Sequence, residues 1–158
     1  MSDKSQYANV FEAIHIRIIT LPSDDVTVFT DMLQSFIGLS AKECSISLSS
    51  FTNTDELEQH ILEASITKTR FCTMFAQDFR SKLSDVLVSQ LLTELPTRVD
   101  EQSCFFVRFC LDTLVAKNEL VLTDSGRCVH LKFSVSAFPR KREVALGIVE
   151  NYLNTKVE

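Results

Sequence analysis

The spacing of hydrophobic and polar residues changes along the chain, and each spacing predicts a different kind of element. In the segment 9–22, isoleucines alternate with polar residues, and this period of two predicts a strand. The segment 23–38 places apolar residues at three- and four-residue steps and ends at Gly38, which predicts an amphipathic helix. Strict alternation returns in 43–51 and predicts a second strand.

The middle of the chain favours helices. In 53–65, two acids follow a candidate N-cap residue and apolar residues recur at helical spacing. From 67 to 95, phenylalanines and then leucines fall at four-residue steps, as one long helix or as two that break near Ser81, with Pro96 as the terminator. The segment 101–117 carries apolar residues around most of a helical wheel, and it predicts a third helical stretch.

The last part of the chain combines a hairpin with a helix. Residues 118–135 read as two short strands around a polar turn, because Asn118 can end the preceding helix and apolar residues alternate in the return strand. The segment 142–154 returns to helical spacing and predicts a closing helix that packs on the rest of the protein.

Together these elements predict an α+β protein. A strand-helix-strand unit covers residues 1–51, and a helical section with the helix and hairpin module covers 53–158. We expect one compact domain over 1–158, in which these two parts are subdomains at most. The first two strands pair either in parallel through a right-handed crossover or antiparallel with the helix packed across them.

Two helices, a third helix and a hairpin in succession resemble a winged-helix module. The resemblance is topological, and it implies a third helix that enters the major groove and a hairpin that contacts phosphate. The residues fit this role poorly, because the segment 101–117 follows Asp100 and begins with Glu101. Of its remaining surface residues Gln102, Ser103, Arg108 and Asp112, Arg108 is the one cation. We therefore interpret this stretch as a core or interface helix.

Composition and charge describe an ordinary folded protein. Hydrophobic residues make up 45% and charged residues 23% of the 158 positions, while Gly 3 and Pro 3 leave little room for long linkers. The formal net charge of −5 disfavours a protein whose main task is to coat a phosphate backbone. Basic residues gather locally in 140–142.

Candidate catalytic chemistry is missing from the sequence. The five cysteines form no CxxC pair and no His lies at zinc-ligand spacing, so we expect reduced thiols and no metal site. No nucleotide-binding or nucleophile motif occurs, and the paired carboxylates fall at predicted helix starts, where acids stabilise the helix dipole. We predict a protein without cofactors that is not an enzyme.

The apolar stretches are too short for a membrane span, and the first residues lack the apolar region of a secretory signal. We therefore expect an intracellular protein, cytoplasmic or nuclear.

Our leading hypothesis is a noncatalytic protein-protein interaction subunit of an intracellular assembly. In one form of this hypothesis the assembly is nuclear and associated with chromatin or nucleic acid. The partner is another protein or a second copy of this chain. Twelve phenylalanines motivate it, because surplus apolar surface is commonly covered by a partner, although the same residues can form a core. The predicted partner-binding residues are Phe105, Phe106, Val129, Leu131 and Tyr152.

The alternative is a nucleic-acid-binding protein of winged-helix type, which uses the basic cluster at 140–142 and the hairpin at 120–135. Lysine and arginine are the residues that contact phosphates, and they set affinity for nucleic acid. The residues predicted to contact nucleic acid are Arg127, Lys132, Arg140, Lys141 and Arg142.

Overall fold

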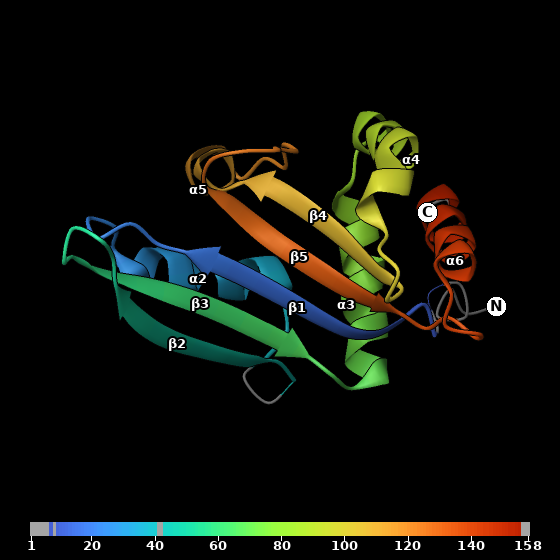
Figure 1. Ribbon diagram of the computed structural model, residues 1–158, viewed down its shortest axis with the longest axis horizontal. Coiled ribbons are helices and arrows are strands. Elements are labelled where there is room, and N and C mark those ends of the chain that lie inside the picture. Colours follow the sequence, from blue (N-terminus) through green and yellow to red (C-terminus); the bar gives the residue numbers. More distant parts are fainter. Residues whose placement is uncertain (1–6, 8, 41–42, 156–158) are drawn as a thin grey trace.

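An antiparallel five-stranded sheet, with strand order β2-β3-β1-β5-β4, organises the protein. The structure is a computed structural model that describes residues 7, 9–40 and 43–155 (Figure 1). The strands are β1 (Phe11–Ile19), β2 (Ser45–Thr52), β3 (Glu58–Ile66), β4 (Cys104–Cys110) and β5 (Cys128–Val135). The helices are α2 (Val26–Ile37), α3 (Thr69–Lys82), α4 (Asp85–Arg98), α5 (Leu111–Lys117) and α6 (Arg142–Asn154).

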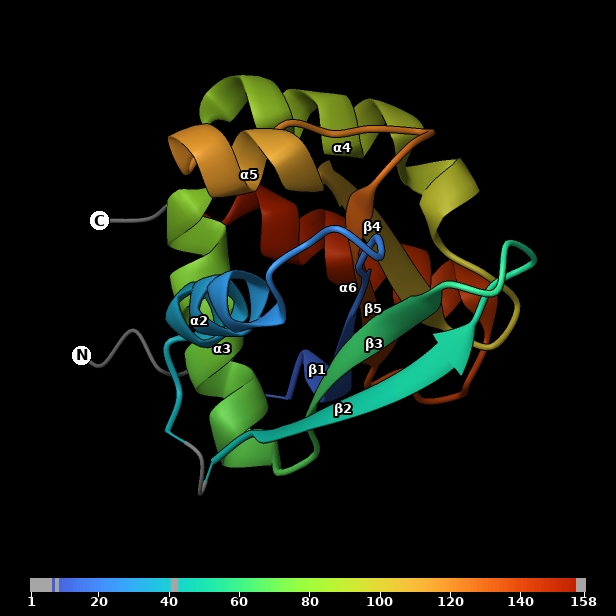
Figure 2. The ribbon, with the colours of Figure 1, turned by 90° about the vertical axis from the view of Figure 1, so that its left-hand side faces the viewer.

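Helices cover one face of the sheet and leave the other uncovered. Figure 1 shows α2 and α3 behind the strands, and the rotated view of Figure 2 places both helices on the same side of the sheet. This side receives the apolar residues of each strand, because successive side chains of a strand point to opposite faces. In β1, Ile14, Ile16 and Ile18 are almost fully buried against the helices.

The core is centred on Phe133 of β5, whose ring meets four other aromatic rings. Its centroid lies 4.7 to 6.4 Å from those of Phe11, Phe75, Phe79 and Phe105, which come from β1, α3 and β4. Close aromatic pairs of this kind add to the free energy gained by burying apolar surface. The cluster ties both halves of the chain into one hydrophobic core and fixes which face of the sheet points outward.

The α+β prediction is confirmed, as are several individual elements. Strands form in the segments 9–22 and 43–51, the helix predicted in 23–38 is α2, and the closing helix predicted in 142–154 is α6. Gly38 ends α2 in the left-handed conformation, with a φ of 71°. The segment 67–95 forms two helices, α3 and α4.

The helix predicted in 53–65 is wrong, because this segment contributes strand β3. Asn53, which with Thr54 was a candidate N-cap, instead closes a turn, and its side chain accepts hydrogen bonds from the backbone N–H groups of Asp55 and Leu57. From Glu58 the chain pairs with β1 on one side and β2 on the other, so that β3 separates the first two predicted strands. Two ladders of backbone hydrogen bonds outweigh a local helical preference.

The third helix predicted in 101–117 is also wrong over its first half. Residues Cys104–Cys110 form β4, and only Leu111–Lys117 are helical. Phe105, Val107 and Phe109 alternate toward the core, but the partly apolar outward positions hide this period of two in the sequence. Asp100 again closes a turn, since its carboxylate accepts from two backbone N–H groups.

The hairpin predicted at 118–135 forms only in part. Its return strand is β5, but β5 pairs with β1 and β4, and the segment before the turn is reduced to one bridge between Leu122 and Phe109. Asn118 does take the left-handed conformation that ends α5. Pro96 lies inside α4 and does not end it. The winged-helix arrangement is therefore not confirmed.

Candidate nucleic-acid interface

The uncovered face of the sheet, which we call the open face, carries the polar half of each strand. Because residues directly opposite in an antiparallel pair share a face, the register identifies its members across all strands. The two central rows are Ser47, Glu63, Arg17, His130 and Arg108, and Ser45, Ser65, His15, Lys132 and Phe106.

Three cations gather on the open face around one histidine. Arg17 of β1 and Arg108 of β4 are the register partners of His130 on its two sides, and Lys132 follows it on the same face of β5. Both arginines are exposed, and Lys132 is half-buried. In the described part of the chain, none of these three cations forms an ion pair. Their charge is available to an anion from outside.

The pKa of His130 reports the local excess of positive charge. Partial burial lowers this pKa below its ordinary value, and Arg108, Arg17 and Lys132 lower it further because they disfavour a fourth cation. At neutral pH the imidazole is therefore uncharged. An anion bound between these cations would raise the pKa of His130.

An aromatic ring lies beside the cations. Phe106 of β4 stacks on His130, with centroids 5.6 Å apart and an angle of 28° between the rings, and it stands opposite Lys132 in the register. His15 of β1 shares a hydrogen bond of 3.1 Å with Ser65 of β3. Flat rings next to phosphate-binding cations are the side chains that contact the bases of single-stranded nucleic acids.

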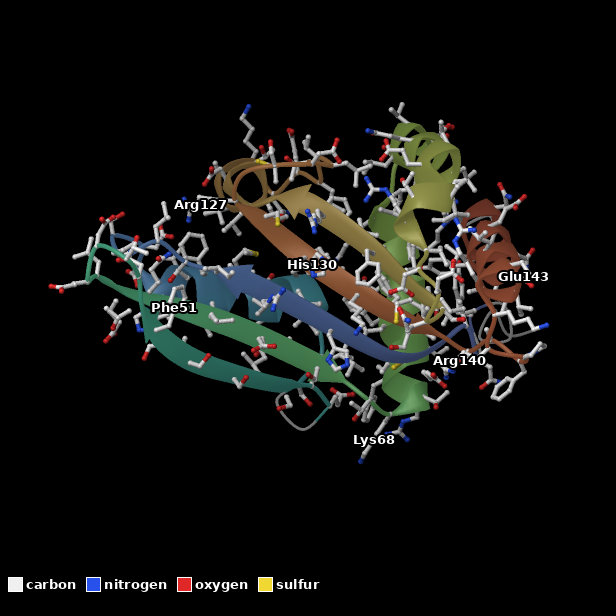
Figure 3. All side chains as sticks on the ribbon, in the orientation of Figure 1. Phe51, Lys68, Arg127, His130, Arg140 and Glu143 are labelled. Carbon is white, nitrogen blue, oxygen red and sulfur yellow. The ribbon has the colours of Figure 1, made fainter. Side chains whose placement is uncertain are left out.

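A groove of about 850 Å³ crosses this part of the open face. It is lined by Arg17, Phe106 and His130 of the sheet and by Thr97 and Arg98 at the end of α4. Figure 3 shows His130 near the middle of the sheet, with Arg127 beyond one end of β5. The volume is in the range of sites that hold small organic ligands.

Of the residues predicted to bind nucleic acid, Lys132 lies in the centre of the open face. Arg127 forms ion pairs with Asp24 and Asp112 near the end of β5 that borders the groove. These two carboxylates already neutralise its charge.

The basic cluster at 140–142 lies at the start of α6. Arg140 is paired with Glu12, and Arg142 donates hydrogen bonds to the carbonyl oxygens of Val99 and Pro96 at the end of α4. Lys141 is exposed. Two of the three cations thus hold elements of the fold together, and a role for this cluster in binding stays a prediction.

The residues predicted to bind a protein partner lie mostly in the core. The side chains of Phe105, Val129 and Leu131 are 0% exposed and that of Tyr152 is 2% exposed, so they offer no surface to a partner in this fold. Tyr152 also donates a hydrogen bond of 2.6 Å to the carbonyl oxygen of Ala76. Phe106 is the member of the set that reaches the open face.

Two further findings concern other kinds of site. Among the residues that the structure describes, no three His, Cys, Asp or Glu side chains gather to hold a metal ion. No described helix is both long enough and apolar enough to cross a bilayer.

The sequence was compared with models of known protein families. A family described as RNA binding matches residues 13–135, which run from β1 to the end of β5 and include every strand of the sheet. The chain belongs to this RNA-binding family. The family assignment supports nucleic-acid binding, the alternative function predicted above, over the hypothesis of a protein-interaction subunit.

A curated relative of this RNA-binding family member carries a matching name. The RNA-binding protein PAB1135 of Pyrococcus abyssi (strain GE5 / Orsay) is 26% identical over 93 residues, which are 59% of this chain and 60% of that protein. The chain thus spans about 60% of the length of the curated relative that it matches. The name of that protein describes RNA binding.

Solved structures share the fold. The DUF54 protein AF2318 from Archaeglobus fulgidus superposes with a TM-score of 0.77 at 18% identity, over 90% of this chain and 99% of that one. A DUF54 protein from Methanothermobacter thermautotrophicus, Mth689, gives a TM-score of 0.74 at 20% identity, over 92% and 99%. At these identities the likeness shows the fold of the RNA-binding family member and not its ligand.

Sequence reasoning missed Arg17 and Arg108 as members of the site. Arg17 lies on a correctly predicted strand, but local alternation does not tell which strand is its neighbour. Arg108 was assigned to a helix, where it stood alone. The available signal was the alternation of Phe105, Val107 and Phe109, which places Arg108 on the polar face of a strand.

Proposed function

We propose that this protein binds RNA through the open face of its sheet, as a binding protein and not as an enzyme. The observation that carries the proposal is the group of three cations, Arg17, Arg108 and Lys132, around His130 on the open face. Among the described residues, none of the three has an ion-pair partner. Phosphate groups are the anions that RNA offers in a row, and lysine and arginine are the side chains that bind them.

The overall charge supports one mode of approach. The chain is negative as a whole, with a formal net charge of −5, whereas the centre of the open face is positive. An RNA strand is repelled by the acidic remainder and attracted to this face, so the charge pattern orients the encounter. Strands in neighbouring positions are about 4.8 Å apart, so Arg17 and Arg108 stand about 10 Å from each other across β5.

Phe106 favours single-stranded RNA as the ligand. In an RNA duplex the bases are stacked on each other and are out of reach of a ring on a sheet, whereas unpaired bases can stack on aromatic side chains. Phe106 lines the groove together with Thr97 and Arg98. We infer that phosphates contact the cations and that one unpaired base stacks in this groove.

Fluorescence anisotropy tests the proposal. The protein is titrated into a labelled single-stranded RNA of mixed sequence and into the matching duplex, at several salt concentrations. We expect tighter binding to the single strand, and log K falling linearly with log salt at about 0.7 for each phosphate contact. Absence of binding, or binding that salt does not change, would remove the proposal; equal binding to the duplex would remove the preference for single strands.

The open face also predicts a pH dependence of RNA binding. In the free protein the pKa of His130 is lowered, so the imidazole is neutral at pH 7. Bound phosphates favour the imidazolium and raise this pKa, which means that binding takes up a proton. Affinity should therefore rise as pH falls from 7.5 to 5.5, by about tenfold at most for each pKa unit that RNA restores.

The matched variant is His130→Gln, which keeps a polar side chain and cannot titrate in this range. Anisotropy titrations at each pH should give a flatter profile for this variant than for the unaltered protein. Identical profiles would mean that protonation of His130 does not contribute to the binding of RNA.

A further inference from the structure

Two cysteines stand directly opposite each other where β4 ends and β5 begins. Cys110 and Cys128 are register partners in the antiparallel pair, so both side chains leave the sheet on the same face. Both residues are partly exposed, whereas Cys44, Cys72 and Cys104 are buried. Cys110 and Cys128 are thus the cysteines that a dissolved reagent can reach.

The hydrogen bonds around the pair define how close the two residues are. The N–H of Leu111 donates to the carbonyl oxygen of Arg127 at 3.1 Å, and the N–H of Cys110 turns away to the carbonyl oxygen of Val121 at 2.7 Å. This pattern marks Cys110 and Cys128 as a non-hydrogen-bonded pair, in which the Cα atoms are about 4.5 Å apart. Disulfides span Cα separations of about 4.4–6.8 Å, so the pair can be bridged without moving the strands apart.

Hydrogen bonds favour the thiolate form of Cys110, which is the reactive form. The hydroxyl of Thr113 donates a hydrogen bond of 3.2 Å to Sγ of Cys110. Hydrogen bonds from the Thr113 side chain and backbone, and a weaker one from the Asp112 backbone, lower the pKa of Cys110 because they stabilise the thiolate. Burial has the opposite effect on Cys72, and it raises the pKa of that thiol to about 11. The thiolate is the form that attacks disulfides.

We propose that Cys110 and Cys128 form a reversible cross-strand dithiol–disulfide pair that exchanges with low-molecular-weight disulfides such as oxidised glutathione. This redox site does not depend on the proposed RNA binding. The Cys110 thiolate attacks one sulfur of the small disulfide, forms a mixed disulfide and expels the first small thiolate. Cys128 then loses its proton to solvent and attacks Sγ of Cys110, which expels the second small thiolate. Two protein thiols are oxidised and one small disulfide is reduced to two thiols.

The exposure of the pair also predicts that the bond is easily reduced. Both cysteines are partly exposed, and exposed disulfides are the labile ones. We expect a small dithiol such as dithiothreitol to open the bridge in the folded protein.

Mass spectrometry of the folded, reduced chain tests the proposal. The protein is incubated with excess oxidised glutathione at neutral pH, quenched with acid and digested after alkylation of the remaining thiols. We expect a product that has lost two hydrogens and whose single bridge joins the peptides of Cys110 and Cys128. A stable glutathione adduct on the unaltered chain, a bridge between other cysteines, or no reaction would each overturn the proposal.

Single variants separate the two steps of the exchange. Cys128→Ser should stop at a stable glutathione adduct on Cys110, because the second thiol is missing. Thr113→Val should shift the pH profile of the exchange rate to higher pH, because Cys110 loses the hydroxyl that stabilises its thiolate, while Thr113→Ser should restore it. Equal profiles for the Val and Ser variants would contradict the assignment of Cys110 as the attacking thiol.

Discussion

Replacing Arg17 and Arg108 together by glutamine is expected to weaken the binding of single-stranded RNA about a hundredfold. Each guanidinium can donate charge-assisted hydrogen bonds to a phosphate, which are worth about 1.5 kcal/mol or more, or about tenfold in affinity. The two sites are about 10 Å apart across β5, so their effects should add. Anisotropy titrations of the single and double variants measure the loss.

The salt dependence gives a second, independent readout of the same variant. Removing two phosphate contacts should make the slope of log K against log salt shallower by about 1.4. A loss of affinity without a change in slope would mean that the arginines act on the fold and not on phosphates. Circular dichroism checks that the double variant is folded, which we expect because both side chains are exposed.

A matched control removes the same charge elsewhere. Lys68 and Lys117 are exposed residues at the start of α3 and the end of α5, outside the groove. The double variant Lys68→Gln/Lys117→Gln has the same net charge as the arginine variant, and it should keep nearly all of the affinity. Lys141→Gln tests the predicted basic cluster separately, since a large loss there would transfer the site to the start of α6.

Replacing Phe106 by leucine is expected to weaken RNA binding by about 5- to 150-fold. Leucine keeps an apolar side chain but has no ring, and stacking of a base on an aromatic side chain is worth about 1–3 kcal/mol. The salt slope should not change, because no cation is lost. Anisotropy titrations of Phe106→Leu and Phe106→Tyr provide the comparison, and the tyrosine variant should bind like the unaltered protein.

The absence of tryptophan from the sequence allows the same contact to be observed directly. Phe106→Trp introduces the one tryptophan of the chain, and a base stacked on it should quench its fluorescence on titration with RNA. RNA that binds this variant without quenching would show that the base contact lies elsewhere. That result would contradict the stacking role of Phe106 without contradicting phosphate binding by the cations.

Local spacing predicted those elements whose two faces differ clearly. Apolar and polar positions alternate strictly from Ile14 to Ile18 of β1 and along β5, and the apolar residues of α2 keep to one stripe, so each pattern had one interpretation. In β4 the outward positions include Phe106 and two cysteines, which made a strand look like a helix with apolar residues all round. In β3 the acids before the strand resembled a helix start, although they belong to a turn.

The candidate site was less predictable than the fold, because it is assembled by strand order. Lys132 occupies a polar position of the predicted return strand, but its neighbours across the sheet, His15 and Phe106, come from positions far away in the chain. No local pattern states that β3 lies between β1 and β2, or that β5 lies between β1 and β4. The cationic group therefore becomes visible only when the register is known.

Strand orientation also explains why most residues predicted to bind a protein partner lie in the core. Phe105, Val129 and Leu131 were selected because a partner can cover apolar surface, but the helices of the same chain already cover it. Apolar content alone does not distinguish a core from an interface. The orientation of each strand makes that distinction, and it leaves Phe106 as the aromatic residue of the set on the open face.

Ultraviolet cross-linking to single-stranded RNA is the most direct test of RNA binding through the open face, because it forms bonds only between bases and the side chains that touch them. The cross-linked protein is digested, and mass spectrometry identifies the peptides that carry a nucleotide. We predict adducts on outward residues of β4 and β5, above all Phe106 and His130, with few in Phe106→Leu. Adducts confined to α2, α3 or the start of α6 would contradict binding through the open face.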